Sequence, residues 1–278
     1  MDERGAMVRA VELAWHGWGR VETNPLVGAV VLQGGAVVGE GCHAEYGGPH
    51  GEVVALAAAG ERARGADLVV TLEPCRHHGK TPPCTEAIVR AGIRRVVFGA
   101  EDVDPAARGG AGALRQGGVV VEGGLLADEV RRQNAVFFHR HGGSARPFVA
   151  VKLALSLDAR IADRDGRSRW VSGEVARDYV QWLRAGFGAI GVAAGTARAD
   201  DPALTVRGPL RPRQAPLRVL FDRRGEVPPT ARLLATARET PTLVVTGREA
   251  GAPARAAVET AGAAVVNADA LAGARAAL

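Results

Sequence analysis

The sequence predicts an α/β protein built from two domains. Strand-like apolar segments alternate with helical segments along the chain, and this alternation favours sheets covered by helices on both faces. The length of 278 residues suits about two domains. A polar stretch with two glycines at 142–147 reads as a linker between them. We therefore predict one domain at 1–141 and a second at 148–278.

Apolar spacing predicts the elements of the first domain in order. A break at Asn24-Pro25 separates the first helix from a hairpin that turns at Gly34-Gly35. The expected helices cover 7–18, 50–59, 84–91 and 125–138, and the expected strands cover 27–32, 36–40, 67–72, 95–99 and 119–121.

The second domain is expected to begin with a strand over 148–155. Ser172 is the expected N-cap of a helix over 173–185. Further strands are expected over 189–193, 217–222 and 242–246. After them we expect an alanine-rich tail, helical in part and without another strand.

One histidine and two cysteines in the first domain form a candidate metal site. His50, Cys75 and Cys84 offer an imidazole and two thiols, and a catalytic zinc site keeps three such ligands and one open position. Glu52 completes the H-x-E…P-C arrangement of zinc-dependent base deaminases, in which the glutamate moves protons. Eight residues separate the cysteines, where that pattern has two. The insert is therefore expected to loop out at the mouth of the site.

This donor set suits the removal of an exocyclic amine from a pyrimidine. Zinc lowers the pKa of bound water to about 7, and a nearby carboxylate can transfer the protons. Cys84 is expected to open a helix after Pro82-Pro83, where a helix N-terminus favours thiolate over thiol.

Other interpretations of these residues remain open. Cys75 and Cys84 are also compatible with buried free thiols or a redox pair. A non-catalytic zinc module would use His77 or His78 as a fourth ligand and leave Glu52 without a role. A nucleic-acid base deaminase would share the zinc site but predicts short cysteine spacing and a basic groove.

Composition narrows the expected partners and location. The net charge of +5 comes mostly from arginine, which suits anionic small molecules such as phosphates. Aromatic residues are only 4% and no dense basic run occurs, so nucleic acid is not an expected partner. The chain shows no run of 18 apolar residues and no signal peptide, so no membrane association is expected. Three cysteines, with Cys42 expected to be a small buried hydrophobe, suit the cytoplasm; a homo-oligomer is left open.

Several motifs together resemble the bifunctional pyrimidine deaminase–reductase family of riboflavin biosynthesis. In that family the long cysteine spacing is normal. The motifs lie at 24–28, 39–43, 49–53 and 71–84 in the first half, and at 151–160, 168–170 and 196–207 in the second.

The resemblance implies a three-layer α/β/α domain with the cytidine-deaminase fold, followed by a dihydrofolate-reductase-like α/β domain. It implies deamination of 2,5-diamino-6-ribosylamino-4-pyrimidinone 5′-phosphate and NADPH-dependent reduction of the ribose. It assigns zinc to His50, Cys75 and Cys84, and proton transfer to Glu52. The deaminase substrate would meet Asn24, His43, His77, Lys80 and Asp102; NADPH would meet Ala154, Trp170, Thr196 and Asp200; the reductase substrate would meet Lys152, Ser168, Arg184, Leu204 and Arg207.

The sequence also departs from the family. Asp104 stands where the family usually has asparagine, and Glu22-Thr23 replaces a usual His-Pro. Family reductase domains continue past the strand at 242–246 with a glycine pair near NADPH, so we expect this half to be C-terminally incomplete. We therefore expect the chain to deaminate its substrate efficiently. We expect it to bind NADPH weakly and to reduce little of the ribosyl product. Four of these residues could instead have purely structural roles. Lys152 could be a solvated residue on an edge strand, and Arg184 a charge on a helix surface. Trp170 could belong to the hydrophobic core, and Asp200 could be part of a turn.

Overall fold

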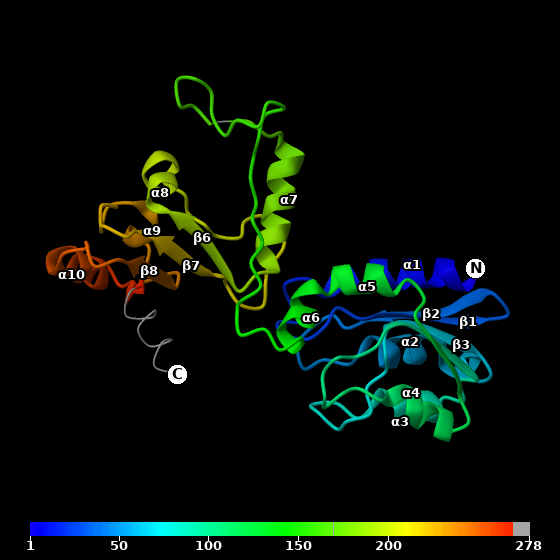
Figure 1. Ribbon diagram of the computed structural model, residues 1–278. Helices are drawn as coiled ribbons and strands as arrows, with labels where there is room; N and C mark the ends of the chain where they lie inside the picture. Colours follow the sequence, from blue (N-terminus) through cyan, green and yellow to red (C-terminus); the bar gives the residue numbers. More distant parts are fainter. Residues whose placement is uncertain (169, 269–278) are drawn as a thin grey trace. The chain divides into compact units, whose positions relative to one another are not determined.

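A computed structural model describes residues 1–168 and 170–268 of the chain (Figure 1). Arg169, from one of the motifs above, and the end of the alanine-rich tail lie outside the described residues. Contacts divide the chain into two compact units, Met1–Lys152 and Leu153–Leu278. The domain limits 1–141 and 148–278 stay a prediction. None of the described helices is long and apolar enough to cross a membrane.

The first unit contains a five-stranded mixed sheet in the order β2-β1-β3-β4-β5. β1 runs antiparallel to both β2 and β3, whereas β3, β4 and β5 are parallel. The β1–β2 hairpin turns at Gly34 and Gly35, which both have the positive φ that a two-residue turn requires. The strands are β1 (Gly28–Gln33), β2 (Ala36–Cys42), β3 (Asp67–Leu72), β4 (Arg95–Ala100) and β5 (Val120–Gly123).

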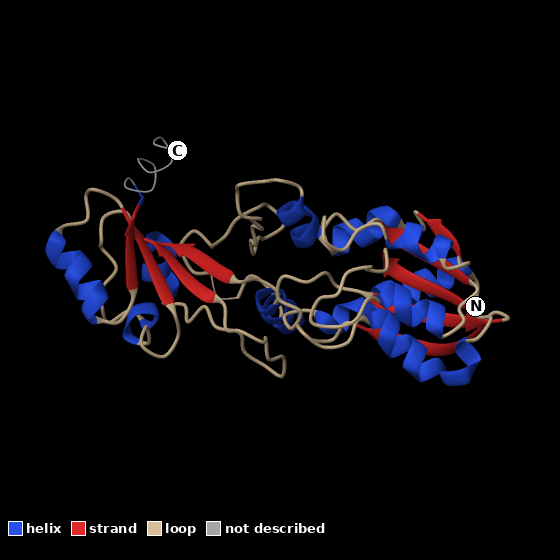
Figure 2. Cartoon of the chain, turned by 90° about the horizontal axis from the view of Figure 1, so that it is seen from below, coloured by secondary structure: helices blue, strands red, loops and turns tan. Residues whose placement is uncertain are grey.

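Helices cover both faces of this sheet, so the predicted three layers are present (Figures 1 and 2). α1 (Glu3–Ala14) and α5 (Ala127–Gln133) lie on one face, and α2 (Gly51–Ala59), α3 (Cys84–Arg90) and α4 (Gly110–Gln116) lie on the other. Short 3-10 turns, η1 (Trp15–Gly17) and η2 (Gly60–Ala63), follow α1 and α2. Val30, Val69 and Val70 are fully buried because apolar layers pack on the sheet from both sides.

Two helices of the first unit differ from the sequence prediction. α1 begins at Glu3 because the Asp2 side chain accepts the backbone N–H of Gly5. The single helix expected over 125–138 is instead split into α5 and α6 (Ala135–His141) at Asn134. The Asn134 Oδ1 accepts the N–H of Leu26 at 2.7 Å, and its Nδ2 donates to the carbonyl of Leu26 at 3.1 Å. This long-range contact holds the loop that carries Asn24.

The second unit contains a four-stranded, fully parallel sheet in the order β6-β7-β8-β9. Its strands are β6 (Ala189–Ala193), β7 (Leu217–Phe221), β8 (Thr242–Thr246) and β9 (Ala264–Asn267). Its helices are α7 (Glu174–Ala185), α8 (Ala194–Asp200), α9 (Arg232–Ala235) and α10 (Ala252–Thr260). Its core is formed by buried side chains such as Leu220, Leu233, Leu234 and Val244.

Three expectations for the second half are wrong. A further strand, β9, does follow β8; it is short and its sequence, Ala-Val-Val-Asn, gives a weak pattern. Gly173, not Ser172, is the N-cap of α7, and no side chain caps it. The expected strand over 148–155 is loop. Val151 and Leu153 in it are largely exposed, and among the described residues no strand pairs with this segment. The apolar composition of this segment predicts a strand, but a strand forms only where a neighbouring strand can pair with it, and composition does not specify that neighbour.

A buried arginine joins β7 to the segment between α9 and β8. Arg218 is only 1% exposed, and its guanidinium donates to the carbonyls of Leu233, Thr236 and Thr240, each at 3.0 Å. It also donates to the Thr242 hydroxyl at 2.7 Å. Neutral acceptors thus satisfy a charged group inside the core of this unit.

Arg218→Met is expected to destabilise the second unit by about 3 kcal/mol or more, because several buried acceptors lose their donor at once. Hydrogen exchange of the β7 and β8 amides in the full chain measures this as a lower opening free energy. The control is Arg198→Met, since Arg198 is half-exposed and pairs with Glu226 at 3.1 Å; its effect should stay within about 0.5 kcal/mol. Equal protection of β7 in both variants would show that the Arg218 network contributes little.

Candidate metal centre and active site

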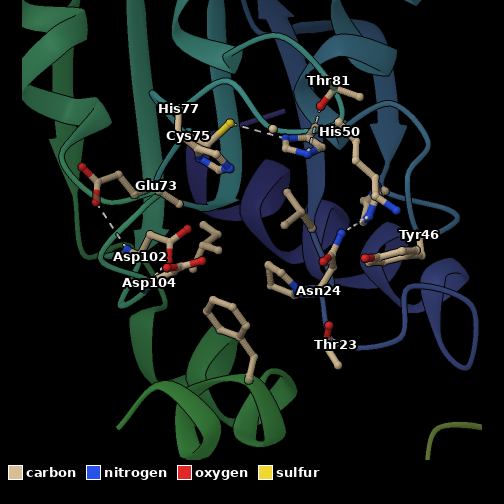
Figure 3. Close-up of a pocket in the computed structure, with 18 of the residues that line it drawn as sticks. Thr23, Asn24, Tyr46, His50, Glu73, Cys75, His77, Thr81, Asp102 and Asp104 are labelled. Carbon is tan, nitrogen blue, oxygen red and sulfur yellow. Dashed lines mark hydrogen bonds between the residues drawn. The ribbon is translucent and has the colours of Figure 1, made fainter. Parts of the chain in front are cut away.

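Three side chains from different elements converge in the first unit. His50 is the N-cap of α2, Cys75 follows β3 after Pro74, and Cys84 is the first residue of α3. The His50 Nδ1 lies 3.2 Å from the Cys84 Sγ. It lies 3.5 Å from the Cys75 Sγ (Figure 3). All three ligand atoms lie within 4.8 Å of one another.

This geometry fits a zinc ion. A nitrogen and a sulfur bound to tetrahedral zinc are about 3.6 Å apart, close to both separations. Contact with Cys84 lowers the pKa of the Cys75 thiol, with His50 contributing in the same direction, so a thiolate is favoured there. The group consists of one imidazole and two sulfurs, and none of the described residues adds a fourth protein ligand. This leaves a position for water.

Glu52 lies on the first turn of α2 and lines the pocket beside these ligands. It is 3% exposed, and its Oε2 is a buried oxygen without a hydrogen-bond partner in the described structure. Burial raises the pKa of Glu52, and the neighbouring His50 opposes this shift. A buried carboxylate oxygen that lacks a partner is suited to a polar ligand entering the pocket.

The pocket has a volume of about 310 Å³. All five residues expected to meet the deaminase substrate line it, together with Glu52, His50 and Cys75. Those five are Asn24, His43, His77, Lys80 and Asp102. Cys84 is fully buried.

Hydrogen bonds fix the orientation of Asn24. The His43 Nδ1 lies 3.0 Å from the Pro49 carbonyl, which can only accept, so this nitrogen carries the proton. Burial lowers the pKa of His43 and favours the neutral ring, so its Nε2 accepts from the Asn24 Nδ2 at 3.1 Å. The amide oxygen of Asn24 is therefore available as an acceptor in the pocket.

Asp102 follows β4, and its carboxyl group lines the pocket. Desolvation raises the pKa of Asp102 to about 6. Glu73 holds this loop: its Oε2 accepts the backbone N–H of Asp102 at 3.3 Å, and its Oε1 accepts that of Ala111 at 2.9 Å. Glu73 thus links the segment before Cys75 to the loop that carries Asp102 (Figure 3) and to α4.

Sequence reasoning missed several other side chains of the pocket. The Lys80 ammonium lies 4.0 Å from the centre of the Tyr46 ring, a cation–π contact that orients it. Glu73 and Thr81 lie inside the motif at 71–84, so their position beside the cysteines was a usable signal. Phe137, Arg140 and His141 also line the pocket and come from a distant segment. Thr23 and Asp104, two of the positions where the sequence departs from the family, line it as well.

In the second unit, the structure brings together only part of the expected reductase site. The Ser168 hydroxyl donates to the Asp200 carboxylate at 3.3 Å. Arg184 donates to the carbonyl of Thr205 at 3.2 Å. Burial lowers the pKa of the Arg184 guanidinium, and the neighbouring charge of Arg207 lowers it further.

The other expected residues are more scattered. Leu204 is buried with φ +50°, Thr196 lies in α8, and Trp170 is 70% exposed and stacks with Arg177 at 4.5 Å. Lys152 and Ala154 lie on the irregular segment that was expected to be a strand.

Comparisons with known proteins cover both halves. The family model for the "Cytidine and deoxycytidylate deaminase zinc-binding region" matches residues 1–100, and the model for the "RibD C-terminal domain" matches 147–273. Both models agree with the predicted fold class, a deaminase-type domain followed by a reductase-type domain. They also support zinc and NADPH as the cofactors of this chain.

Full-length relatives agree with these domains. The riboflavin biosynthesis protein RibD of Bacillus amyloliquefaciens is 45% identical over 82% of this chain and 61% of its own length. That of Aquifex aeolicus is 42% identical over 89% of this chain and 69% of its own length. The chain thus spans between three fifths and seven tenths of these relatives.

Solved structures give the same result. Acinetobacter baumannii RibD matches with a TM-score of 0.78 and 37% identity, over 95% of this chain and 73% of that one. The Thermotoga maritima diaminohydroxyphosphoribosylaminopyrimidine deaminase/5-amino-6-(5-phosphoribosylamino)uracil reductase matches with a TM-score of 0.78 and 38% identity, over 95% and 80%. With relatives at this identity aligned over more than two thirds of their length, the chain belongs to the RibD family of riboflavin biosynthesis proteins.

Proposed function

We propose that the first unit is a zinc-dependent hydrolytic deaminase acting on a phosphorylated aminopyrimidine, the class of substrate named for the Thermotoga relative. One observation carries this proposal: His50, Cys75 and Cys84 converge beside the buried Glu52 in a single pocket. His50, Cys75 and Cys84 would hold the zinc. Bound zinc supplies a Lewis acid that makes water nucleophilic at neutral pH.

The other residues of the pocket have separate roles in this proposal. Glu52 takes a proton from water, delivers it to the ring nitrogen and assists the departing ammonia. The amide oxygen of Asn24 accepts a hydrogen bond from an amino group of the ring. Asp102, whose backbone N–H donates to Glu73, accepts a hydrogen bond from the opposite edge of the substrate ring. Burial of these groups excludes bulk water and strengthens each polar contact.

We further infer that Lys80 recognises the 5′-phosphate, with His77 as a second polar group of the same pocket. The Nδ1 of His77 is buried and lacks a partner among the described residues, and the Lys80 ammonium is oriented by Tyr46. Both lie in the insert between the cysteines. A cation and an imidazole at the rim of the pocket suit an anionic group of the substrate.

Lys80→Gln is expected to raise the KM for the phosphorylated substrate by about tenfold or more, because hydrogen bonds to charged groups contribute about 1.5–3 kcal/mol. The KM for the corresponding nucleoside should change little. Arg90→Gln is the control, because it removes the same charge from an exposed site on α3 outside the pocket. An equal rise in KM for the nucleotide and for the nucleoside would contradict phosphate recognition by Lys80.

We propose a second activity for the second half of the chain, NADPH-dependent reduction of the ribosyl group of the deaminated product, with the weak NADPH binding and low turnover that the sequence predicts. The contact between Ser168 and Asp200 and the neighbouring charges of Arg184 and Arg207 support a polar, anion-binding site. Ser168, Arg184, Leu204, Arg207 and Lys152 would meet the sugar phosphate; Ala154, Trp170, Thr196 and Asp200 would meet NADPH. Oxidation of NADPH in the presence of the deaminated intermediate tests this half.

Metal content and ammonia release test the main proposal together. One zinc per chain and ammonia release from the free pyrimidine nucleotide are expected. Ammonia release only from a nucleic-acid base would favour the base deaminase, and bound zinc without turnover would favour a non-catalytic module. We also infer a reducing, cytoplasmic location, since Cys42 is free of disulfides and Cys75 and Cys84 are proposed zinc ligands.

A further inference from the structure

Thr81 contacts the metal-binding histidine from the side opposite the sulfurs. Its Oγ1 lies 3.3 Å from the His50 Nε2 (Figure 3). The Nδ1 of the same ring lies 3.5 Å from the Cys75 Sγ and 3.2 Å from the Cys84 Sγ. Thr81 is part of the eight-residue insert that separates the two cysteines.

The two ring nitrogens must therefore have different roles. A ligating nitrogen presents its lone pair to the metal, so Nδ1 carries no proton when zinc is bound. The proton of the neutral ring then resides on Nε2, which can donate to the hydroxyl oxygen of Thr81. The second nitrogen of a metal-bound histidine commonly donates to such an acceptor, which fixes both the tautomer and the ring orientation.

The backbone around Thr81 is held on both sides. The Thr81 carbonyl accepts the N–H of Gly79 at 3.2 Å, which ties Thr81 to the preceding part of the insert. Pro82 and Pro83 follow, and each ring fixes φ of its residue. Cys84 then begins α3. The hydroxyl of Thr81 is thus placed by the same few residues that deliver the last sulfur.

We propose that Thr81 is a positioning residue for the metal centre, which locks His50 in the tautomer and orientation that zinc requires. The insert between the cysteines then has two roles: Lys80 faces the substrate and Thr81 supports a zinc ligand. This inference rests on the proposed zinc-dependent function.

The test is zinc affinity of the full chain, measured by competition with a chromogenic chelator. Thr81→Val removes the acceptor but keeps the shape of the side chain, and loss of such a support typically weakens metal binding by about 10–100-fold. Thr81→Ser keeps the hydroxyl and should bind zinc as the unmodified chain does. The visible spectrum of the Co²⁺-loaded protein should shift in the valine variant and not in the serine variant.

Three results would overturn the inference. They are unchanged zinc affinity in Thr81→Val, equal weakening in Thr81→Ser, or a cobalt spectrum that is the same in all variants. Thr81→Ala, which also lacks the acceptor, replaces the valine variant if that protein does not fold. An unmodified chain that fails to bind zinc would instead contradict the proposed function itself.

Discussion

Glu52→Gln is expected to keep zinc and fold but to lose deaminase turnover by about 10³–10⁴-fold. General acid–base groups contribute about 10²–10⁴ in rate. The upper part of this range applies because one carboxylate serves several proton transfers in the proposed reaction. The amide nearly matches the carboxyl group in size, so the buried position on α2 stays filled, but the amide cannot take a proton from water.

Single-turnover ammonia release, measured beside zinc content, separates chemistry from metal loss. The control is Glu61→Gln, an exposed glutamate in the 3-10 turn after α2, which should keep full activity. Near-normal ammonia release by zinc-loaded Glu52→Gln would show that another group moves the protons. Loss of zinc from that variant would instead mean that Glu52 supports the metal site.

The core of the candidate site could be predicted because its signals are local. His50 precedes an almost wholly apolar segment that forms a helix, and Cys84 follows two prolines that start another helix. The strand that delivers Cys75 is a short apolar run whose bounds, Asp67–Leu72, match the expected 67–72. Each ligand is therefore fixed by the sequence within a few residues of itself, and parallel pairing of β3 with β4 then places Asp102 beside them.

Features that depend on distant contacts could not be predicted in this way. Asn134 interrupts an otherwise helical pattern because its amide binds Leu26, 108 residues earlier. Arg140 and His141, which line the pocket, lie in α6, the helix that follows this interruption. In the second unit, the apolar run at 148–155 has the composition of a strand, yet pairing depends on a partner strand that composition does not specify. The short strand β9 shows the opposite case. Its sequence pattern is weak, but pairing with the neighbouring β8 holds it as a strand.

Cys75→Ser is expected to remove zinc and deaminase activity together. A serine hydroxyl stays protonated at neutral pH, whereas the Cys75 thiol has a pKa lowered by contact with Cys84 and favours the thiolate that zinc binds. The remaining His50 and Cys84 are too few for a three-ligand site, so zinc content of the purified chain should fall to background.

The matched control for this loss is Cys42→Ser. Cys42 is half-buried in β2 and lies outside the metal-binding group, so its variant should retain zinc and ammonia release. Chemical removal of zinc from the unmodified chain should reproduce the Cys75→Ser phenotype, and added Zn²⁺ should restore activity only in the unmodified chain. Full zinc occupancy in Cys75→Ser would contradict the ligand assignment, because it would require a different third ligand. Loss of zinc from both cysteine variants would mean that the metal site depends on general packing of the first unit and not on the Cys75 sulfur.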